Sequence, residues 1–217
     1  MKNIVITVAR QYGSGGRTVA KMLSEQLGIH YYDKELSKVA SERSGINEAL
    51  FIDSDERVKR KWGAKLSISL GSKIYDGSLK HPGEADFTSD KNIFGYQAEA
   101  MRYLAEKGEP CIIVGRAADF VLRDYENVLR VFVHADHDFL MQEAGKVQSL
   151  TGKELEKFIA QIDKGRADYY EYHTGNVWTD ARNYDLCLNS GVLGFEKCVE
   201  AIKAYAKVRF GEDVFDD

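Results

Sequence analysis

The chain has 217 residues, of which 44% are hydrophobic and only 2 are proline, and its formal net charge is −4. This length and composition predict one folded α/β domain and exclude a disordered chain. The negative charge gives no general attraction to nucleic acid or to an anionic membrane, and no apolar run suits a membrane span or a signal peptide. With three widely spaced cysteines that lack metal-ligand spacing, the sequence favours a cytoplasmic protein.

The first 28 residues predict a strand, a glycine-rich turn and a helix. Residues 4–8 form a short apolar run rich in β-branched side chains, as in a strand buried on both faces. Apolar residues then recur at helical spacing over 19–27, and Gly28 follows as a helix C-cap. The turn between the two elements consists of Gly13, Ser14, Gly15 and Gly16.

This order of strand, glycine turn and helix predicts a site for phosphate groups. It directs backbone N–H groups and a helix N-terminus at one place, and glycine lets an anion reach the backbone. Arg10 and Arg17 flank the turn and could add charge-assisted contacts, while the Thr18 hydroxyl could bind a magnesium ion. A turn that links a strand to a helix without any ligand is the alternative.

The turn departs from the common P-loop pattern G-x-x-x-x-G-K-[ST]. When Gly15 is aligned with the second glycine, Gly16 stands at the lysine and Arg17 at the serine or threonine. In a variant of the pattern one glycine separates the lysine from the threonine, and in that alignment Thr18 fits and only the lysine is missing.

The next segment predicts a brief strand over 29–33 and a helix over 34–44, with Asp33 as a candidate N-cap. Residues 46–92 differ, because their periodicity is poor and they are too long for a plain loop in a compact domain. We expect an inserted lobe there that closes over a substrate. Its basic residues form either a solvated helix face or a ligand contact: Arg57, Lys59, Arg60 and Lys61.

A helix over 92–107 and a buried strand over 111–114 come next. Arg116 stands at the carboxyl end of this strand, where ligands bind in open parallel sheets. It either holds a phosphate in a bidentate contact or is an ordinary surface arginine. Asp119 could cap a helix or pair with Arg116.

Two further strands are predicted over 128–136 and 184–190. Helices are predicted over 136–148 and 195–208, and the acidic tail after the second is expected to fray. Because the five strands alternate with helices and the crossovers are long, we expect a three-layer α/β/α sandwich around a five-stranded parallel sheet, with Cys111 and Cys187 in buried strands.

Between these segments, Thr151 and Glu154 form a capping box that predicts the start of another helix. In this helix Asp163, Arg166 and Tyr170 fall on one face. Such a face is either a solvated ion pair or part of a mobile lid that reaches a phosphate.

Taken together, four segments make the chain resemble the cytidylate kinase-like family, a branch of the P-loop nucleoside monophosphate kinases. They are RQYGSGGRTVA, VGRAAD, IDKGRADYY and YDLCLNS. The resemblance covers nearly the whole chain. It implies a P-loop nucleoside triphosphate hydrolase fold in a single domain, 1–217, with an acceptor-binding lobe at 46–92 and a lid within 146–180. In two departures, Ala117 replaces an aspartate of the family, and the segment after the fourth strand lacks arginines.

The resemblance also implies phosphoryl transfer from ATP, with Mg²⁺, to a nucleoside monophosphate, most simply CMP or dCMP. Residues 13–18 and Arg10 would hold the donor phosphates. Either Arg17 or Arg10 would replace the lysine, and Thr18 would hold magnesium.

The same resemblance assigns Arg116 to the acceptor phosphate and Arg166 to charge on the transferred group. Asp33 would orient either the acceptor or a metal-bound water, and Asp119 and Asp163 would belong to the acceptor side of the site. A kinase for another small acceptor is an alternative, and a nucleotide-binding regulatory protein with little turnover is another, since the lysine is absent. The sequence leaves the choice between a monomer and a homodimer open.

Overall fold

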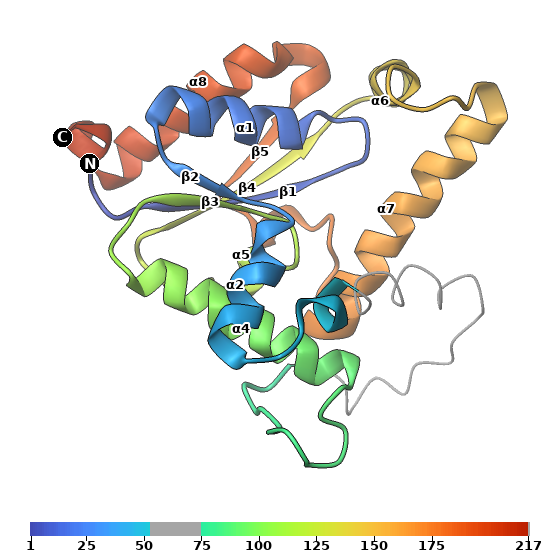
Figure 1. Ribbon diagram of the computed structural model, residues 1–217. Helices are drawn as coiled ribbons and strands as arrows, with labels where there is room; N and C mark the ends of the chain where they lie inside the picture. Colours follow the sequence, from blue (N-terminus) through green and yellow to red (C-terminus); the bar gives the residue numbers. More distant parts are fainter. Residues whose placement is uncertain (53–74, 217) are drawn as a thin grey trace.

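The computed structural model describes residues 1–52 and 75–216. Its centre is a parallel sheet with the strand order β2-β3-β1-β4-β5 (Figure 1). The strands are β1 (Val5–Arg10), β2 (His30–Tyr32), β3 (Cys111–Val114), β4 (Val128–His134) and β5 (Leu186–Asn189). In the central register, Val5 of β1 lies opposite Cys111 on one side and Val128 on the other. The predicted five-stranded parallel sheet is confirmed.

Helices follow or precede each strand, as the crossover lengths predict. They are α1 (Gly16–Leu27), α2 (Glu35–Ser44), α4 (Asp90–Glu106), α5 (Ala118–Val121), α6 (His137–Gly145), α7 (Gly152–Thr174) and α8 (Ser190–Phe210), with 3-10 turns η1 (Ala181–Asn183) and η2 (Glu212–Phe215). Residues 48–52 are also helical. Gly28 closes α1 in the left-handed conformation, as expected, and Gly194 kinks α8.

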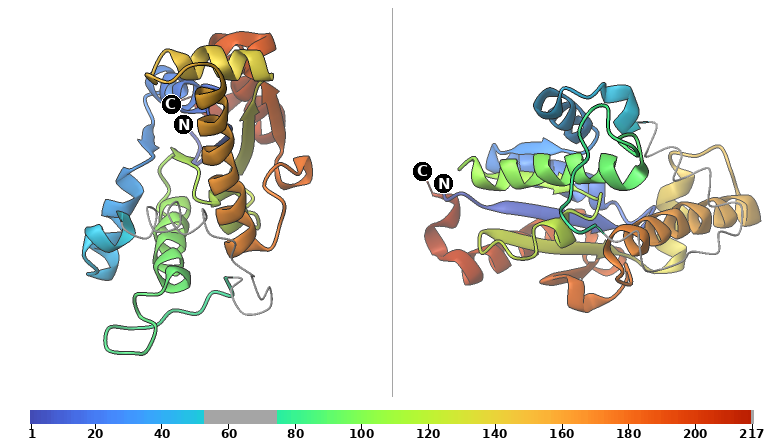
Figure 2. Two further views of the ribbon diagram at one scale, coloured as in Figure 1. Left: turned by 90° about the vertical axis from the view of Figure 1, so that its right-hand side faces the viewer. Right: turned by 90° about the horizontal axis from the view of Figure 1, so that it is seen from below.

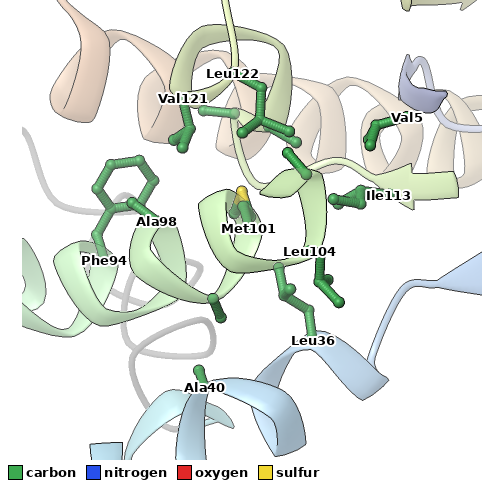
Figure 3. Packing of buried hydrophobic residues seen from close by; sticks show 14 of the residues in the cluster. Val5, Leu36, Ala40, Phe94, Ala98, Met101, Leu104, Ile113, Val121 and Leu122 are labelled. Carbon is green, nitrogen blue, oxygen red and sulfur yellow. The ribbon is translucent and has the colours of Figure 1, made fainter. Parts of the chain in front are cut away.

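Two apolar cores lie on the two faces of the sheet, because successive side chains of a strand point to opposite sides. Ile6 and Val8 of β1 pack with α1 and α8, whereas Val5 and Ala9 pack with α2, α4 and α5. Figure 1 shows these two layers of helices above and below the sheet. Figure 3 shows Met101 of α4 inside the core that contains α2, α4 and α5, in the region between α2 and α5. The chain therefore forms the predicted three-layer sandwich.

The strand order fixes where a ligand can bind. From β1 the chain moves to β2 and β3 on one side and afterwards to β4 and β5 on the other. In open parallel sheets, ligands bind outside the carboxyl ends of the strands at such a reversal. Here the reversal is at the carboxyl end of β1, where the glycine turn follows. The helix α7 runs past this edge of the sheet, from α6 toward the N-terminal turns of α4, where His173 stacks on Phe94 (Figures 1 and 2).

Three local predictions are wrong. The tail is not frayed, because Val214 is fully buried and the Lys2 backbone N–H donates to its carbonyl, which ties the two ends together. Cys187 is exposed, because β5 is an edge strand. Thr151 does precede α7, but its side chain makes no capping hydrogen bond, so the capping box is absent.

The predicted lobe at 46–92 is described only in part, and Arg57, Lys59, Arg60 and Lys61 lie outside the described residues. Tyr75 is buried, and its backbone N–H donates to the His173 carbonyl of α7. Ser89 then caps α4 by accepting from the Asn92 N–H. In the part of the chain that the structure describes, no helix has the length and apolarity needed to cross a membrane.

Candidate phosphate-binding site

The carboxyl edge of the sheet gathers most of the residues singled out by the sequence. Arg10 is the last residue of β1, Asp33 follows β2, and Arg116 follows β3. The turn after β1 leads into α1, which starts at Gly16. Because parallel strands end at one edge, residues separated by a hundred positions in the chain meet here.

The glycine turn is held in place by close contacts on both sides. A Cβ at Gly13 would lie 2.5 Å from the Leu140 carbonyl oxygen, and one at Gly15 would lie 2.2 Å from the Phe195 ring. Both glycines have positive φ, which other residues adopt only with strain. Ser14 is fully buried, and its carbonyl accepts a hydrogen bond of 2.7 Å from the Ser190 hydroxyl. The turn therefore has one fixed shape.

The N-terminus of α1 is open to an anion. Its N-cap is Gly15, which has no side chain to accept from the first N–H groups. The Ser14 hydroxyl donates instead to the Gln11 carbonyl. Thr18 lies exposed on the first turn of α1. Free N–H groups and the positive end of the helix dipole together suit a phosphate group.

Asp33 connects two arginines beside this helix end. Its carboxylate lies 2.7 Å from Nε of Arg17 and 3.9 Å from a terminal nitrogen of Arg10. The interpretation of Asp33 as a helix cap is wrong, because Lys34 is the N-cap of α2 and no side chain caps that helix. Instead, the ion pair with Arg17 holds Asp33 beside the glycine turn.

Three arginines crowd this part of the molecule. Burial, followed by repulsion from Arg166, lowers the pKa of the Arg10 guanidinium to about 9, although Asp33 opposes this effect. Burial also lowers the pKa of Arg166, against the attraction of Asp163. Arg17 repels both of these guanidinium groups. Three positive charges therefore share this region with only two carboxylates, Asp33 and Asp163. An anion bound among them would relieve this repulsion.

Through Asp163 and Arg166, the helix α7 contacts the residues directly before the glycine turn. The Tyr12 backbone N–H donates to the Asp163 carboxylate at 2.7 Å, and Arg166 donates to the same oxygen at 3.0 Å and to the Arg10 carbonyl at 2.9 Å. Burial raises the pKa of Asp163, while Arg166 and the Tyr12 N–H oppose that rise. The predicted Asp163–Arg166 face is confirmed. Tyr12 is a contact that sequence reasoning missed, because nothing in its spacing indicates α7.

Arg116 occupies a strained backbone position. Its φ is 56° and that of Ala117 is 53°, both in the left-handed region that side chains seldom adopt. Its guanidinium donates to the Ser37 hydroxyl of α2 at 2.8 Å. Backbone strain of this kind persists only where surrounding contacts hold the residue in place, and such residues are frequent at functional sites.

Asp119 does not serve as a helix cap, because Ala117 holds that position in α5. It is buried, and its carboxylate accepts a hydrogen bond of 2.6 Å from the Tyr170 hydroxyl. Burial raises the pKa of Asp119 to about 6, although Tyr170 opposes the rise. The carboxylate is therefore directed into the core, toward Tyr170 of α7.

A metal ion would find few protein ligands here. Over residues 1–52 and 75–216, no three His, Cys, Asp or Glu side chains are grouped as a metal site. The exposed Thr18 hydroxyl beside an open helix N-terminus fits a magnesium ion that keeps most of its ligands from phosphate and water.

A family model matches most of this chain, and a solved structure supports the fold. Residues 5–192 match the family model described as the cytidylate kinase-like family. The crystal structure of an uncharacterized protein from Eubacterium ventriosum is 25% identical, has a TM-score of 0.68, and aligns over 95% of this chain and 99% of that chain. A shikimate kinase from Bacteroides thetaiotaomicron is 15% identical, with a TM-score of 0.49 over 94% of this chain and 98% of its own.

A shorter sequence match is to a protein that is described as a urease subunit. An 81-residue stretch is 33% identical to a urease subunit beta from Clostridium perfringens. This match includes 36% of the chain, and the chain spans 66% of the length of that curated relative. The family match, in contrast, runs from β1 to the start of α8. The chain therefore belongs to the cytidylate kinase-like family.

Proposed function

We propose that the protein transfers a phosphoryl group from ATP, with Mg²⁺, to a nucleoside monophosphate, most simply CMP or dCMP. Family membership supports the broader class, a kinase for a nucleotide or another small molecule. The observation that carries the proposal is the open N-terminus of α1 beside three arginines and only two carboxylates. Such catalysis consists mainly of positioning and of balancing charge on phosphate oxygens.

The donor phosphates would lie against the N–H groups of residues 13–18. Gly13 and Gly15 allow the backbone to approach closely, and Arg10 and Arg17 supply positive charge beside Asp33. Magnesium, when bound, would neutralise phosphate charge from the Thr18 side. The three free cysteines suit the reducing cytoplasm, where we place the protein.

The acceptor would lie toward β3 and α2. Arg116 is our candidate for its phosphate, because the residue is held in a strained conformation at a strand end and is joined to α2 through Ser37. Arg166 would balance charge on the transferred group from the lid within 146–180. We assign no acceptor contact to Asp119, because Tyr170 occupies its carboxylate in the core.

The second candidate is a nucleotide-binding regulator with little turnover. One observation favours it: the Tyr12 N–H, directly before the glycine turn, donates to the Asp163 carboxylate, so a protein anion already lies beside the site.

A coupled assay of ADP release across CMP, dCMP, UMP, AMP and non-nucleotide acceptors separates these possibilities. We expect turnover with a pyrimidine nucleoside monophosphate. ATP binding without turnover on any acceptor would favour the regulator.

Arg116→Lys tests the acceptor assignment by calorimetry. Lysine keeps the charge but cannot make the planar two-bond contact, so acceptor binding should weaken much more than ATP binding. The exposed Arg123→Lys is the control, since Arg123 contacts its near neighbours, the Phe120 carbonyl and Asp124. Equal losses for both ligands, or none, would leave Arg116 an ordinary arginine.

A further inference from the structure

The side chain of Arg10 runs between two glycines. A Cβ at Gly16 would lie 2.4 Å from Cβ and 3.1 Å from Cγ of Arg10. At the other end, a Cβ at Gly115 would lie 2.2 Å from a terminal nitrogen of the same arginine. The Arg10 stem therefore lies against the first residue of α1, and its guanidinium crosses the end of β3 toward Asp33.

Gly16 needs no special backbone conformation. It is the first residue of α1 and its φ is not positive, so alanine would be a better helix former there. The atom that most strongly excludes a side chain is the Arg10 Cβ, which the backbone of β1 fixes. A Cβ at position 16 would also lie 3.2 Å from the Val133 Cβ, a tight but smaller conflict. The side chain at position 10 is therefore the main reason that position 16 is glycine.

The P-loop pattern gives this contact a meaning. When Gly15 is aligned with the second glycine of G-x-x-x-x-G-K, Arg10 falls on the first glycine and Gly16 on the lysine. One position has gained a cationic side chain where the pattern has glycine, and the other has lost one. The structure shows that the two positions touch.

We propose that positions 10 and 16 have exchanged a glycine and a cation, so that Arg10 performs the task of the P-loop lysine toward the donor phosphates. The inference rests on the proposed function and makes it more specific. Arg10 suits the task better than Arg17, whose side chain is 58% exposed and held by Asp33, because that of Arg10 is only 16% exposed. A charge with little solvent around it acts more strongly on a phosphate.

ATP binding by calorimetry, with magnesium present, tests the exchange in four variants. Arg10→Gly should weaken binding roughly 10- to 100-fold, the size of a lost charge-assisted contact. Gly16→Lys should also weaken it, because the new Cβ meets Arg10. The double variant R10G/G16K should regain most of the lost affinity. R10A/G16K should not, because alanine keeps the Cβ that blocks position 16.

Wild-type affinity in Arg10→Gly would overturn the role of Arg10, and a double variant no better than Arg10→Gly would overturn the exchange. The thermal stability of Gly16→Ala gives a readout that needs no nucleotide. It should lower the melting temperature in the wild-type background and raise it or leave it unchanged in Arg10→Gly.

Equal effects of Gly16→Ala in both backgrounds would overturn the exchange even if ATP binds. Absence of ATP binding by the wild-type protein, with the stability coupling intact, would instead reject the proposed function while the contact between the two positions stands.

Discussion

Two parts of α7 lie in different surroundings, although they belong to one continuous helix of 23 residues. The first part, 152–166, reaches Arg10 and Tyr12 with Asp163 and Arg166, whose side chains form a mostly buried ion pair. The second part, 167–174, is built into the core, where Tyr170, His173 and Thr174 are buried. Figure 2 shows how the helix extends from one layer of the molecule toward the other.

The two parts of α7 are also held by different contacts. Asp163 and Arg166 make polar contacts with residues 10 and 12, which a bound nucleotide could replace. In the second part, the His173 ring stacks on Phe94 at 4.1 Å, and Tyr170 donates to the buried Asp119. If residues 146–180 act as the lid that we propose, these contacts anchor it near the carboxyl end of α7. We expect its movement to be confined to the part before Tyr170.

The largest effect should come from Arg166→Ala, in the part of α7 that contacts residues 10 and 12. If Arg166 balances charge on the transferred group, kcat should fall on the order of 100- to 1000-fold. The free energy of unfolding should fall by about 1–3 kcal/mol, because the Arg166–Asp163 pair is mostly buried, although Asp163 keeps the Tyr12 N–H as a partner. Lys164→Ala is the control, since Lys164 is exposed and pairs with the nearby Asp168. Unchanged kcat with lowered stability would reverse our assignment of the two parts of α7.

Tyr170→Phe, in the second part of α7, should lower stability and leave kcat nearly unchanged. It removes the donor to the buried Asp119 carboxylate and should lower the free energy of unfolding by about 1–3 kcal/mol. The loss should be smaller at pH 5 than at pH 8, because a folded-state pKa of about 6 leaves Asp119 largely protonated at the lower pH. Chemical denaturation at both pH values measures this, with the exposed Tyr103→Phe as the control. A pH-independent loss would count against a charged Asp119 in the core.

His173, in the second part of α7, should make the free energy of unfolding sensitive to acid. Burial lowers the pKa of His173 from its ordinary value of 6.5 to about 3, so the folded state favours the neutral ring. Its contribution is fully present above pH 6.5 and is lost as the pH falls toward 3, because the unfolded chain then binds the proton. Between pH 7.5 and pH 5 this loss amounts to about 2 kcal/mol.

His173→Phe keeps the aromatic packing and removes the titrating ring, so the stability of this variant should depend less on pH over that range. The exposed His137→Gln controls for the removal of a histidine. An unaltered pH profile in His173→Phe would show that the ring is protonated or solvated in the folded protein.

The smallest effect should come from Thr151→Ala at the start of α7. Because the Thr151 side chain makes no capping hydrogen bond, the free energy of unfolding should change by less than about 0.5 kcal/mol. Ser89→Ala is the matched comparison, since Ser89 does cap α4, and it should cost about 1 kcal/mol. Equal losses in thermal denaturation would mean that the capping box forms after all.

Local patterns in the sequence were sufficient for the five strands, the long helices and their order, but not for α5 and the 3-10 turns. The β-branched runs at 4–8 and 111–114, the helical periodicity after Gly16 and the glycine at position 28 each depend on near neighbours in the chain. Long crossovers between buried strands required a parallel sheet with helices on both faces. The glycine turn before α1 predicted the phosphate site for the same local reason.

Contacts between distant residues were decided only by the tertiary structure. Asp33 has the spacing of a helix cap, yet the sheet order brings it to Arg17 and Arg10. Asp119 could not be assigned to Tyr170, nor Tyr12 to Asp163, without the path of α7. The sequence marks Gly16 as a missing lysine, but only the packing of β1 against α1 shows that the Arg10 side chain occupies the space beside it. Periodicity and turn chemistry act over a few residues, whereas the partner of a charged side chain depends on which strands end side by side.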